Sequence, residues 1–219
     1  MMFPDRTKYG KRVPKQSLYS HLHLDSSLKQ IVQDFIKLIR WEYVLKERTL
    51  NLPRGRVVEE IEVLGYELKE NTDLEPLLRQ MDREIPYHLV HILRYEGRAK
   101  IYMAYKEPTQ GKNFFRVDKY YCTDWLAEEE IPLSIEGLDL DEVYENFLRQ
   151  VAGAALPQAK EDESLKESVE REQEIAALDK ELQRLEAAKR KESQFKRKVE
   201  INNEIKKLKR KRLQLVGSD

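Results

Sequence analysis

The sequence predicts an α+β protein: a mainly antiparallel four-stranded sheet with packed helices, followed by a C-terminal helical hairpin or coiled coil. Three observations support this class. Runs rich in β-branched and aromatic residues recur between residues 57 and 122, with turn residues between them. Helical spacing of apolar residues precedes, separates and follows these runs. From residue 158 to residue 216, apolar residues recur at steps of three and four, and no proline or glycine interrupts them.

The first elements of the chain are an irregular segment and a helix. Residues 3–20 mix basic and aromatic residues without periodicity, so either packing across the body or contact with a partner is open for this segment. Asp25, Ser26 and Ser27 then offer side-chain oxygens that cap a helix. Apolar residues from Leu28 onward give this helix one apolar face, so we expect it to run to about Leu45.

A strand and a short helix follow. Residues 57–69 carry apolar side chains on both faces of an extended chain, as in a central strand. Gly65 lies where the apolar phase changes, which is typical of a bulge. Asn71, Thr72 and Asp73 then predict the start of a short helix, which tolerates Pro76 in its first turn and ends before Pro86.

The rest of the body is predicted as a hairpin, a fourth strand and a helix. Strand-forming residues 87–95 and 98–106 flank Glu96 and Gly97, a favourable turn dipeptide. Residues 114–122 form the fourth strand, and residues 138–151 form an amphipathic helix. The alanine-rich stretch 152–157 predicts a linker to the tail. We therefore expect an α+β domain over residues 1–155 and a helical tail over residues 156–219.

The tail contains two apolar seams that do not share one heptad register. They are separated by the polar stretch 189–194, and the first half of the tail is acidic where the second half is basic. Antiparallel packing sets acidic residues beside basic ones, which favours a hairpin over one long helix that dimerises. Self-association through the tail stays an alternative. The seam residues are Ile175, Leu178, Leu182 and Leu185, then Ile201, Ile205, Leu208 and Leu215.

Composition excludes several classes of protein. The 219 residues have a formal net charge of zero, so the overall balance does not require a polyanionic partner. The single cysteine, Cys122, excludes an intramolecular disulfide, and one cysteine with four scattered histidines lacks zinc spacing. The N-terminus has no apolar core of a signal peptide, and no run reaches membrane-spanning length. We expect a cytoplasmic protein without membrane contact and without a cofactor.

Glu67 and Lys69 are the candidates for chemistry. They project to the same side of the predicted strand, where a carboxylate beside an ammonium can hold a divalent metal and orient a water. This Glu-x-Lys resembles half of the motif of PD-(D/E)xK nucleases, which also place an acid on the preceding strand. No such acid is evident here. The alternative is an ion pair at an exposed strand end, so the sequence leans towards a protein that is not an enzyme.

Basic residues near both ends of the chain are candidates for contact with nucleic acid or with a protein partner. They would neutralise phosphates without reading sequence, and that binding would weaken with salt. A solvated helix face is the alternative. The candidates are Lys8, Lys11, Arg12 and Lys15 at the N-terminus, and Lys206, Lys207, Lys209, Arg210, Lys211 and Arg212 in the tail.

Five segments together resemble a known family. They are residues 9–15, residues 39–52, residues 60–69, residues 81–87 and residues 194–202. In this order they resemble the uncharacterised prokaryotic family catalogued as domain of unknown function 4391. The resemblance implies a gene neighbourhood with helicases and DNA methyltransferases in anti-phage or restriction clusters. It implies no catalytic residues.

These observations lead to one main expectation and two alternatives. The main expectation is a non-catalytic accessory subunit of an anti-phage defence or restriction-modification complex, with helicase or DNA methyltransferase partners. The first alternative is a metal-dependent nuclease of the PD-(D/E)xK kind centred on Glu67 and Lys69. The second is a non-specific DNA-binding adaptor that uses the basic ends.

Overall fold

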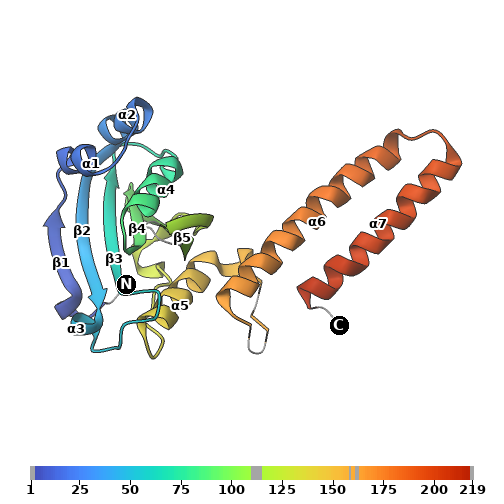
Figure 1. Ribbon diagram of the computed structural model, residues 1–219. Helices are drawn as coiled ribbons and strands as arrows, with labels where there is room; N and C mark the ends of the chain where they lie inside the picture. The colour runs from blue at the N-terminus through green and yellow to red at the C-terminus, as the bar shows by residue number, and fades with distance from the viewer. Residues whose placement is uncertain (1–2, 110–114, 158, 161–162, 218–219) are drawn as a thin grey trace. The chain divides into compact units, whose positions relative to one another are not determined.

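The computed structural model describes residues 3–109, 115–157, 159–160 and 163–217. The chain divides into two compact units (Figure 1), Met1–Gly153 and Ala154–Asp219, which we call the body and the tail. The predicted boundary after residue 155 falls near this division. No helix in the described ranges has the length and apolar character needed to cross a membrane.

The body is built on a seven-stranded mixed sheet. Neighbouring strands follow the order β1-β2-β3-β4-β5-β6, and β7 pairs with the start of β5. Only β3 and β4 are parallel, and helix α4 (Glu75–Glu84) connects them. The strands are β1 (Lys8–Arg12), β2 (Ile36–Lys46), β3 (Glu60–Leu68), β4 (His88–Tyr95), β5 (Arg98–Pro108), β6 (Phe115–Cys122) and β7 (Leu126–Ala127).

The expected four-stranded, mainly antiparallel sheet is therefore corrected to seven strands and a mixed topology. The long helix expected to reach Leu45 is also wrong beyond Phe35, because α2 covers only Ser26–Phe35 and β2 starts at Ile36. Bulges in β2, one between Trp41 and Tyr43, break the alternation of its apolar residues. The broken alternation resembles the spacing of a helix. The segment is nevertheless a strand, because it pairs with β1 and β3.

Residues 3–20, which lack periodicity in the sequence, contain strand β1 and helix α1. Strand β1 forms the edge of the sheet and all five of its residues are exposed, so it shows no apolar alternation. Helix α1 (Lys15–His21) is short and buries only Leu18. An exposed edge strand and a two-turn helix leave almost no periodic pattern in a sequence.

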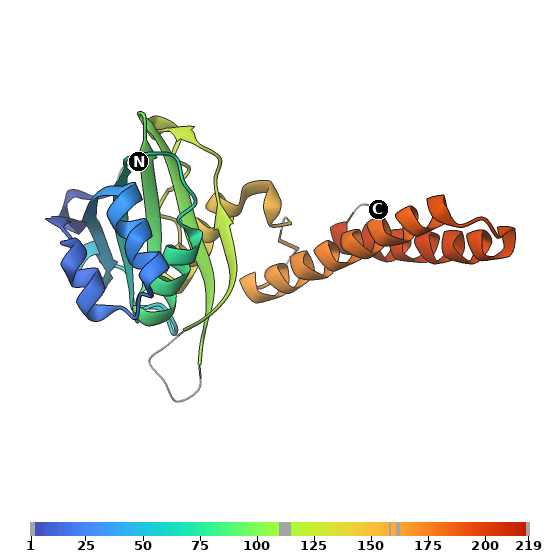
Figure 2. The same ribbon diagram turned by 90° about the horizontal axis from the view of Figure 1, so that it is seen from above.

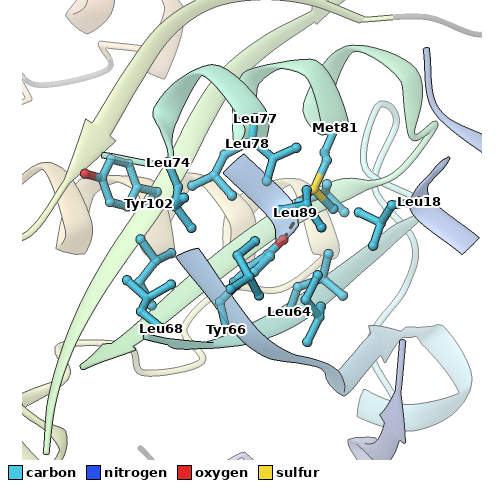
Figure 3. Packing of buried hydrophobic residues seen from close by; sticks show 14 of the residues in the cluster. Leu18, Leu64, Tyr66, Leu68, Leu74, Leu77, Leu78, Met81, Leu89 and Tyr102 are labelled. Carbon is cyan, nitrogen blue, oxygen red and sulfur yellow. Dashed lines mark hydrogen bonds between the residues drawn. The ribbon is translucent and has the colours of Figure 1, made fainter. Parts of the chain in front are cut away.

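Helices α1, α2 and α4 cover one face of the sheet (Figure 2). Side chains at alternate positions of β3 and β4 point to this face and meet the apolar residues of the three helices. Figure 3 shows Leu64 and Tyr66 of β3 packed against Leu77 and Met81 of α4. Both Tyr66 and Leu77 are fully buried.

Helix α5 (Leu140–Ala152) covers the opposite face. Its Tyr144 donates a hydrogen bond of 2.6 Å to the carbonyl of Ala104 and packs edge-on against His88. The carboxylate of Asp141 accepts hydrogen bonds from the backbone N–H groups of Arg56 and Val58, at 2.8 and 2.7 Å. The loop before β3 is thus tied to the start of α5.

One finer expectation is met and one is revised. The turn Glu96-Gly97 between β4 and β5 has positive φ at both residues, 47° and 74°, as a two-residue hairpin turn requires. The expected bulge at Gly65 is revised, because the irregularity lies in the neighbouring strand β2. A Cβ at Gly65 would instead collide with the carboxylate of Glu42. Residue 114, the expected start of the fourth strand, lies outside the described residues.

The tail consists of helices α6 (Leu165–Lys191) and α7 (Phe195–Val216), joined by residues 192–194. Ser164 caps α6 in a reciprocal pair with Glu167, and Gly217 ends α7 in the left-handed conformation at φ 79°. The two helices pack on each other, which is compatible with the predicted hairpin and its turn.

Candidate functional site

Glu67 and Lys69 make separate contacts. The Glu67 carboxylate lies 3.6 Å from Nζ of Lys37, on the neighbouring strand β2, and both side chains are substantially exposed. Lys69 Nζ donates a hydrogen bond of 2.8 Å to the carbonyl of Gln33, in the last turn of α2. Its backbone N–H bonds to the carbonyl of Phe35. Lys69 therefore satisfies carbonyl groups at the end of a helix, where a positive charge is favourable.

Lys15, expected in a nucleic-acid contact, reaches the same helix end. Its Nζ donates to the carbonyl of Ile36 at 2.5 Å and lies 3.4 Å from the carbonyl of Gln33. Burial, together with the nearby charge of Lys69, lowers the pKa of Lys15. Helix α2 has no basic residue of its own in its last turn, so Lys15 and Lys69 supply that charge from outside.

Lys8, Lys11 and Arg12 lie on the exposed edge strand β1. The ammonium of Lys11 lies 4.6 Å from the ring centroid of Tyr9, whose ring packs on Trp41. Charged side chains on an edge strand discourage pairing with another chain. The edge position explains these residues without a ligand, and their contact with nucleic acid stays a prediction.

The basic residues expected at the end of the tail divide into two groups. Lys209 pairs with Glu186 at 2.8 Å, Lys211 pairs with Glu174 at 2.6 Å, and Arg212 forms two hydrogen bonds with Asp179. These pairs join the basic second helix to the acidic side of the first. For Lys206, Lys207 and Arg210, no ion pair is found in the described part of the chain.

The apolar seam of the hairpin is narrow. Its buried cluster consists of Leu182, Leu185 and Ile205, flanked by the half-buried Ile201 and Leu208. Leu178 extends the seam on α6. A two-helix unit of this kind depends on a few side chains, and most residues of α7 outside the seam are exposed.

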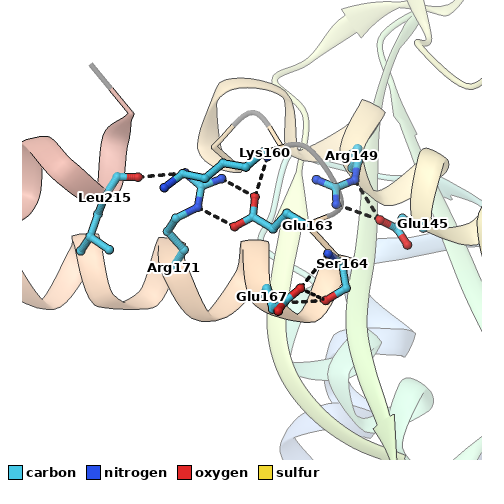
Figure 4. Close-up of polar contacts among 8 residues, drawn as sticks. All are labelled: Glu145, Arg149, Lys160, Glu163, Ser164, Glu167, Arg171 and Leu215. Atoms are coloured by element: carbon cyan, nitrogen blue, oxygen red, sulfur yellow. Dashed lines mark hydrogen bonds and ion pairs between the residues drawn. The ribbon is translucent and has the colours of Figure 1, made fainter. Parts of the chain in front are cut away.

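The open end of the hairpin is closed by an arginine. Arg171 of α6 donates two hydrogen bonds to the carboxylate of Glu163 and one of 3.0 Å to the carbonyl of Leu215 in α7 (Figure 4). The Arg171 hydrogen bond lowers the pKa of Glu163 to about 2. The contact with Leu215 fixes the last turn of α7 against α6, which sets the register of the two helices.

Helix α7 presents a second face beside the seam, which we call the outer stripe, and two of its members, Asn202 and Lys209, also contact α6. Residues along it recur at steps of three and four, and Lys206 lies about 100° around the helix from the seam residue Ile205. Four of the seven large apolar residues that are exposed in the described chain belong to it. The outer stripe consists of Phe195, Val199, Asn202, Lys206, Lys209, Leu213 and Val216.

The turn end of the hairpin carries a concentration of positive charge, which we call the tip: Lys189, Arg190 and Lys191 before the turn and Lys196, Arg197 and Lys198 after it. Lys189 donates a hydrogen bond to Asn202, and Phe195 beside the turn is 81% exposed. In the sequence, the first three cations indicate only the point where the heptad register of the tail breaks. Their proximity to the second three follows from the turn.

A buried polar cluster under α4 was not foreseen. Asp82 of α4 pairs with Lys106 of β5 at 2.7 Å and with Nε2 of His91 of β4 at 2.9 Å. Tyr66 and Tyr120 complete the cluster, through hydrogen bonds to Nδ1 of His91 and to the Asp82 carboxylate. The side chains of Asp82, His91 and Lys106 are all 0% exposed.

The electrostatics of this cluster favour an ionised Asp82. Burial raises the pKa of Asp82, but Lys106 and His91 outweigh it and hold that pKa well below its usual range. Burial lowers the pKa of Lys106 against the opposing effect of Asp82. The nearby His88, on the opposite face of β4, has its pKa lowered to about 3, mainly by burial and then by Lys106.

The cluster fixes α4 on the sheet. Lys106 also donates to the backbone carbonyls of Asp82 and Tyr87, which closes the end of α4 and the following turn. Within the described ranges, no three His, Cys, Asp or Glu residues are placed to hold a metal ion. The sequence indicated this cluster only through Asp82, an acidic residue among the apolar positions Leu78, Met81 and Ile85. The partners of Asp82 are distant in the sequence, so they could not be found there.

A family model matches most of this chain. No curated protein and no solved structure is similar to this chain. One family model, described as "Domain of unknown function (DUF4391)", matches residues 1–211. That match covers the body and nearly all of the tail, in agreement with the five segments that resemble this family. The chain therefore belongs to the DUF4391 family of domains of unknown function.

Proposed function

We propose that this protein is a non-catalytic interaction subunit of a cytoplasmic anti-phage defence or restriction-modification complex. The tail hairpin is its contact surface for a helicase or DNA methyltransferase subunit. The outer stripe of α7 carries this proposal, because it gathers exposed apolar side chains on one face of a helix that already buries its seam elsewhere. The family alone assigns no activity.

The chemistry of the outer stripe defines the partner surface. Phe195 and Val199 lie at one end and Leu213 and Val216 at the other, and Val199 and Leu213 are about 21 Å apart along the helix. Lys206 lies between these apolar ends, beside Lys209, which is paired with Glu186, and α7 carries nine lysines and arginines against two glutamates. A partner helix with apolar residues at both ends and acidic residues in the middle would complement this face.

The contacts of the nuclease candidates support a role without catalysis. Lys69 caps α2, and Glu67 lies beside Lys37 across the strands. The residue of β2 opposite Glu67 is Leu38, where a nuclease of the PD-(D/E)xK kind would need an acid nearby. The candidate motif thus has a structural explanation for each of its two charged residues.

The experiment is copurification of the tagged full chain from its native host, followed by identification of helicase and methyltransferase subunits. The double variant Phe195→Glu with Leu213→Glu places two charges in the outer stripe. Its matched control is Leu138→Glu, since Leu138 in the body is 79% exposed and Phe195 is 81% exposed. We expect the double variant to lose the partner and the control to keep it.

Retention of the partner by the double variant would contradict the outer stripe as the interface. Circular dichroism checks that α6 and α7 stay helical in that variant. A chain cut after residue 157 that still retains the partner would contradict any role for the tail.

A second candidate function rests on the tip. Six cations flank the turn, and apart from Lys189 their side chains form no ion pair or hydrogen bond in the part of the chain that the structure describes. The exposed Phe195 offers a ring on which a base can stack. This arrangement favours non-specific binding of single-stranded DNA by the same subunit.

The test is binding of a fluorescent oligothymidine across a salt series. We expect affinity to fall steeply with salt, and to fall further in the variant Lys196→Gln, Arg197→Gln and Lys198→Gln. The matched control is Lys8→Gln, Lys11→Gln and Arg12→Gln on β1. Equal loss in both triple variants would indicate diffuse attraction and contradict a site at the tip.

A further inference from the structure

A cavity of about 190 Å³ lies in the body between α1, β2, β3 and α4. Apolar side chains form most of its wall: Leu18 from α1, Ile39 from β2, Leu64 from β3 and Met81 from α4. Each of these residues also belongs to the main apolar core. The cavity is therefore a concave, preformed part of a rigid region, which is typical of sites for small ligands.

Ser17 and His21 of α1, Trp41 of β2 and Glu62 of β3 interrupt this apolar wall, and the last two lie on the sheet. The Nε1 atom of Trp41 is buried and finds no hydrogen-bond acceptor among the described residues. Glu62 is 5% exposed as a residue, and its carboxyl forms no hydrogen bond or ion pair with the described residues. Both residues line the cavity. Buried polar groups are normally hydrogen-bonded, so an unpaired donor and an unpaired carboxyl at one cavity require an explanation.

Strand geometry directs both groups to the same space. Glu62 and Leu64 are two apart on β3 and point to one face of the sheet. Trp41 pairs with Leu64 across the β2–β3 ladder and shares that face. The bulge between Trp41 and Tyr43 turns the strand at this point, so the indole is set by the backbone and does not depend on a mobile loop.

We propose that this cavity binds a small neutral molecule with an apolar ring and an amide-like edge. The carbonyl of the ligand accepts a hydrogen bond from Nε1 of Trp41, and the neighbouring N–H of the ligand donates to the carboxyl of Glu62. Leu18, Ile39 and Met81 enclose the ring. This ligand site is separate from the tail and independent of the partner contact proposed above.

Size and charge restrict the ligand to this class. The cavity is smaller than the roughly 300 to 1,000 Å³ of a site for a drug-sized molecule, so it admits a single-ring compound. An anionic ligand would face the carboxyl of Glu62 beside a mostly apolar wall, which is unfavourable. A purely apolar ligand would leave both the indole N–H and the carboxyl unpaired.

The test is a titration of the ¹⁵N-labelled full chain with benzamide, followed by NMR of the indole N–H groups. The protein has two tryptophans, so Trp41 supplies the reporting signal and Trp125 an internal reference, and Trp41→Phe assigns them. Toluene and benzoate are the matched probes, since they keep the ring and replace the amide with a methyl group or an anion.

We expect benzamide to shift the Trp41 signal saturably, with little change at Trp125, and to bind at least tenfold more tightly than toluene or benzoate. The variant Glu62→Leu should bind benzamide at least tenfold more weakly. Absence of saturable shifts overturns the proposal, and so does equal binding of toluene, which would indicate an apolar void without polar recognition. If Glu62→Leu does not fold, the comparison of the three probes on the parent protein still decides.

Discussion

The body and the tail use pairs of opposite charge in different environments. In the body, Asp82 and Lys106 are 0% exposed and lie inside an apolar core. In the tail, Asp179 and Arg212 are 41% and 40% exposed and lie beside a narrow seam. The distances are similar, at 2.7 and 2.5 Å, so the two pairs differ mainly in their access to water.

This difference implies different roles for the same chemistry. Removing one member of a buried pair leaves an unpaired charge in the core, whereas exposed pairs contribute little and weaken with salt. The buried cluster therefore specifies the position of α4 on the sheet. The surface pairs of the tail mainly select the antiparallel orientation of the two helices. The body has a large core with buried ion pairs, whereas the tail has a narrow apolar seam and mostly exposed side chains.

The largest expected effect comes from Asp82→Asn. This change leaves Lys106 buried without its carboxylate, and we expect the body to lose about 3 to 5 kcal/mol in its free energy of unfolding. Denaturant unfolding followed by tryptophan fluorescence measures this, because both tryptophans lie in the body. The control Asp179→Asn should cost less than about 1 kcal/mol in the tail, as judged from helical circular dichroism. Equal losses would contradict the contrast between the two units.

A second prediction concerns Glu62, a buried carboxyl without a partner. Burial, and then the charge of Glu60, raise its pKa from 4.5 to about 7, although Lys106 and Lys46 oppose the shift. Because the folded protein favours the protonated form, stability from this group is present below pH 4.5 and is lost as the pH rises through 7. The loss amounts to about 3 kcal/mol at most.

The variant Glu62→Gln removes that titration. We expect the parent protein to lose stability relative to Glu62→Gln between pH 5 and pH 8, measured by denaturant unfolding at several pH values. The control Glu67→Gln changes an exposed carboxylate and should leave the pH profile unchanged. A parent profile parallel to that of Glu62→Gln would show that Glu62 titrates normally.

The stability of the tail should depend on the few buried side chains of its seam. Ile205→Ala should destabilise the hairpin by about 2 kcal/mol, at the low end for buried isoleucine because few side chains surround it. Hydrogen exchange by mass spectrometry should show faster exchange in peptides of α6 and α7 and unchanged exchange in β3 and β4. The control is Val199→Ala, since Val199 is 42% exposed. Faster exchange throughout the body would indicate that the two units unfold together.

Sequence periodicity predicted the elements that have one regular pattern. The hairpin of β4 and β5, helix α5 and the two tail helices all carry clear spacing over their length. It failed for β1, which is exposed throughout, and for β2, whose bulges disturb the alternation. Both strands are defined by their partners in the sheet, and pairing between distant strands leaves no mark in a local window.

The candidate site shows the same limit. The charges of α6 and α7 correctly indicated antiparallel pairing, because that inference needs only the order of acidic and basic residues. The polar cluster of Asp82, His91 and Lys106 could not be inferred, since each residue is unremarkable in its own element and only the fold brings the three together. The motif Glu67-Leu68-Lys69 was misleading for the opposite reason. Its spacing is suggestive, but its two charged residues bond to different neighbours.

The smallest expected effects come from substitution of Lys69 and of Glu67, which have different contacts. Lys69→Ala removes a hydrogen bond and a positive charge from the end of α2, so we expect a loss of about 1 kcal/mol in the stability of the body. Glu67→Ala removes one exposed ion pair and should cost less than about 0.5 kcal/mol. Under the nuclease alternative, both variants would instead abolish a Mg²⁺- or Mn²⁺-dependent cleavage of DNA. We expect the parent protein to cleave no faster than the double variant, and cleavage lost in both single variants would replace the structural explanation of Lys69 with a catalytic one.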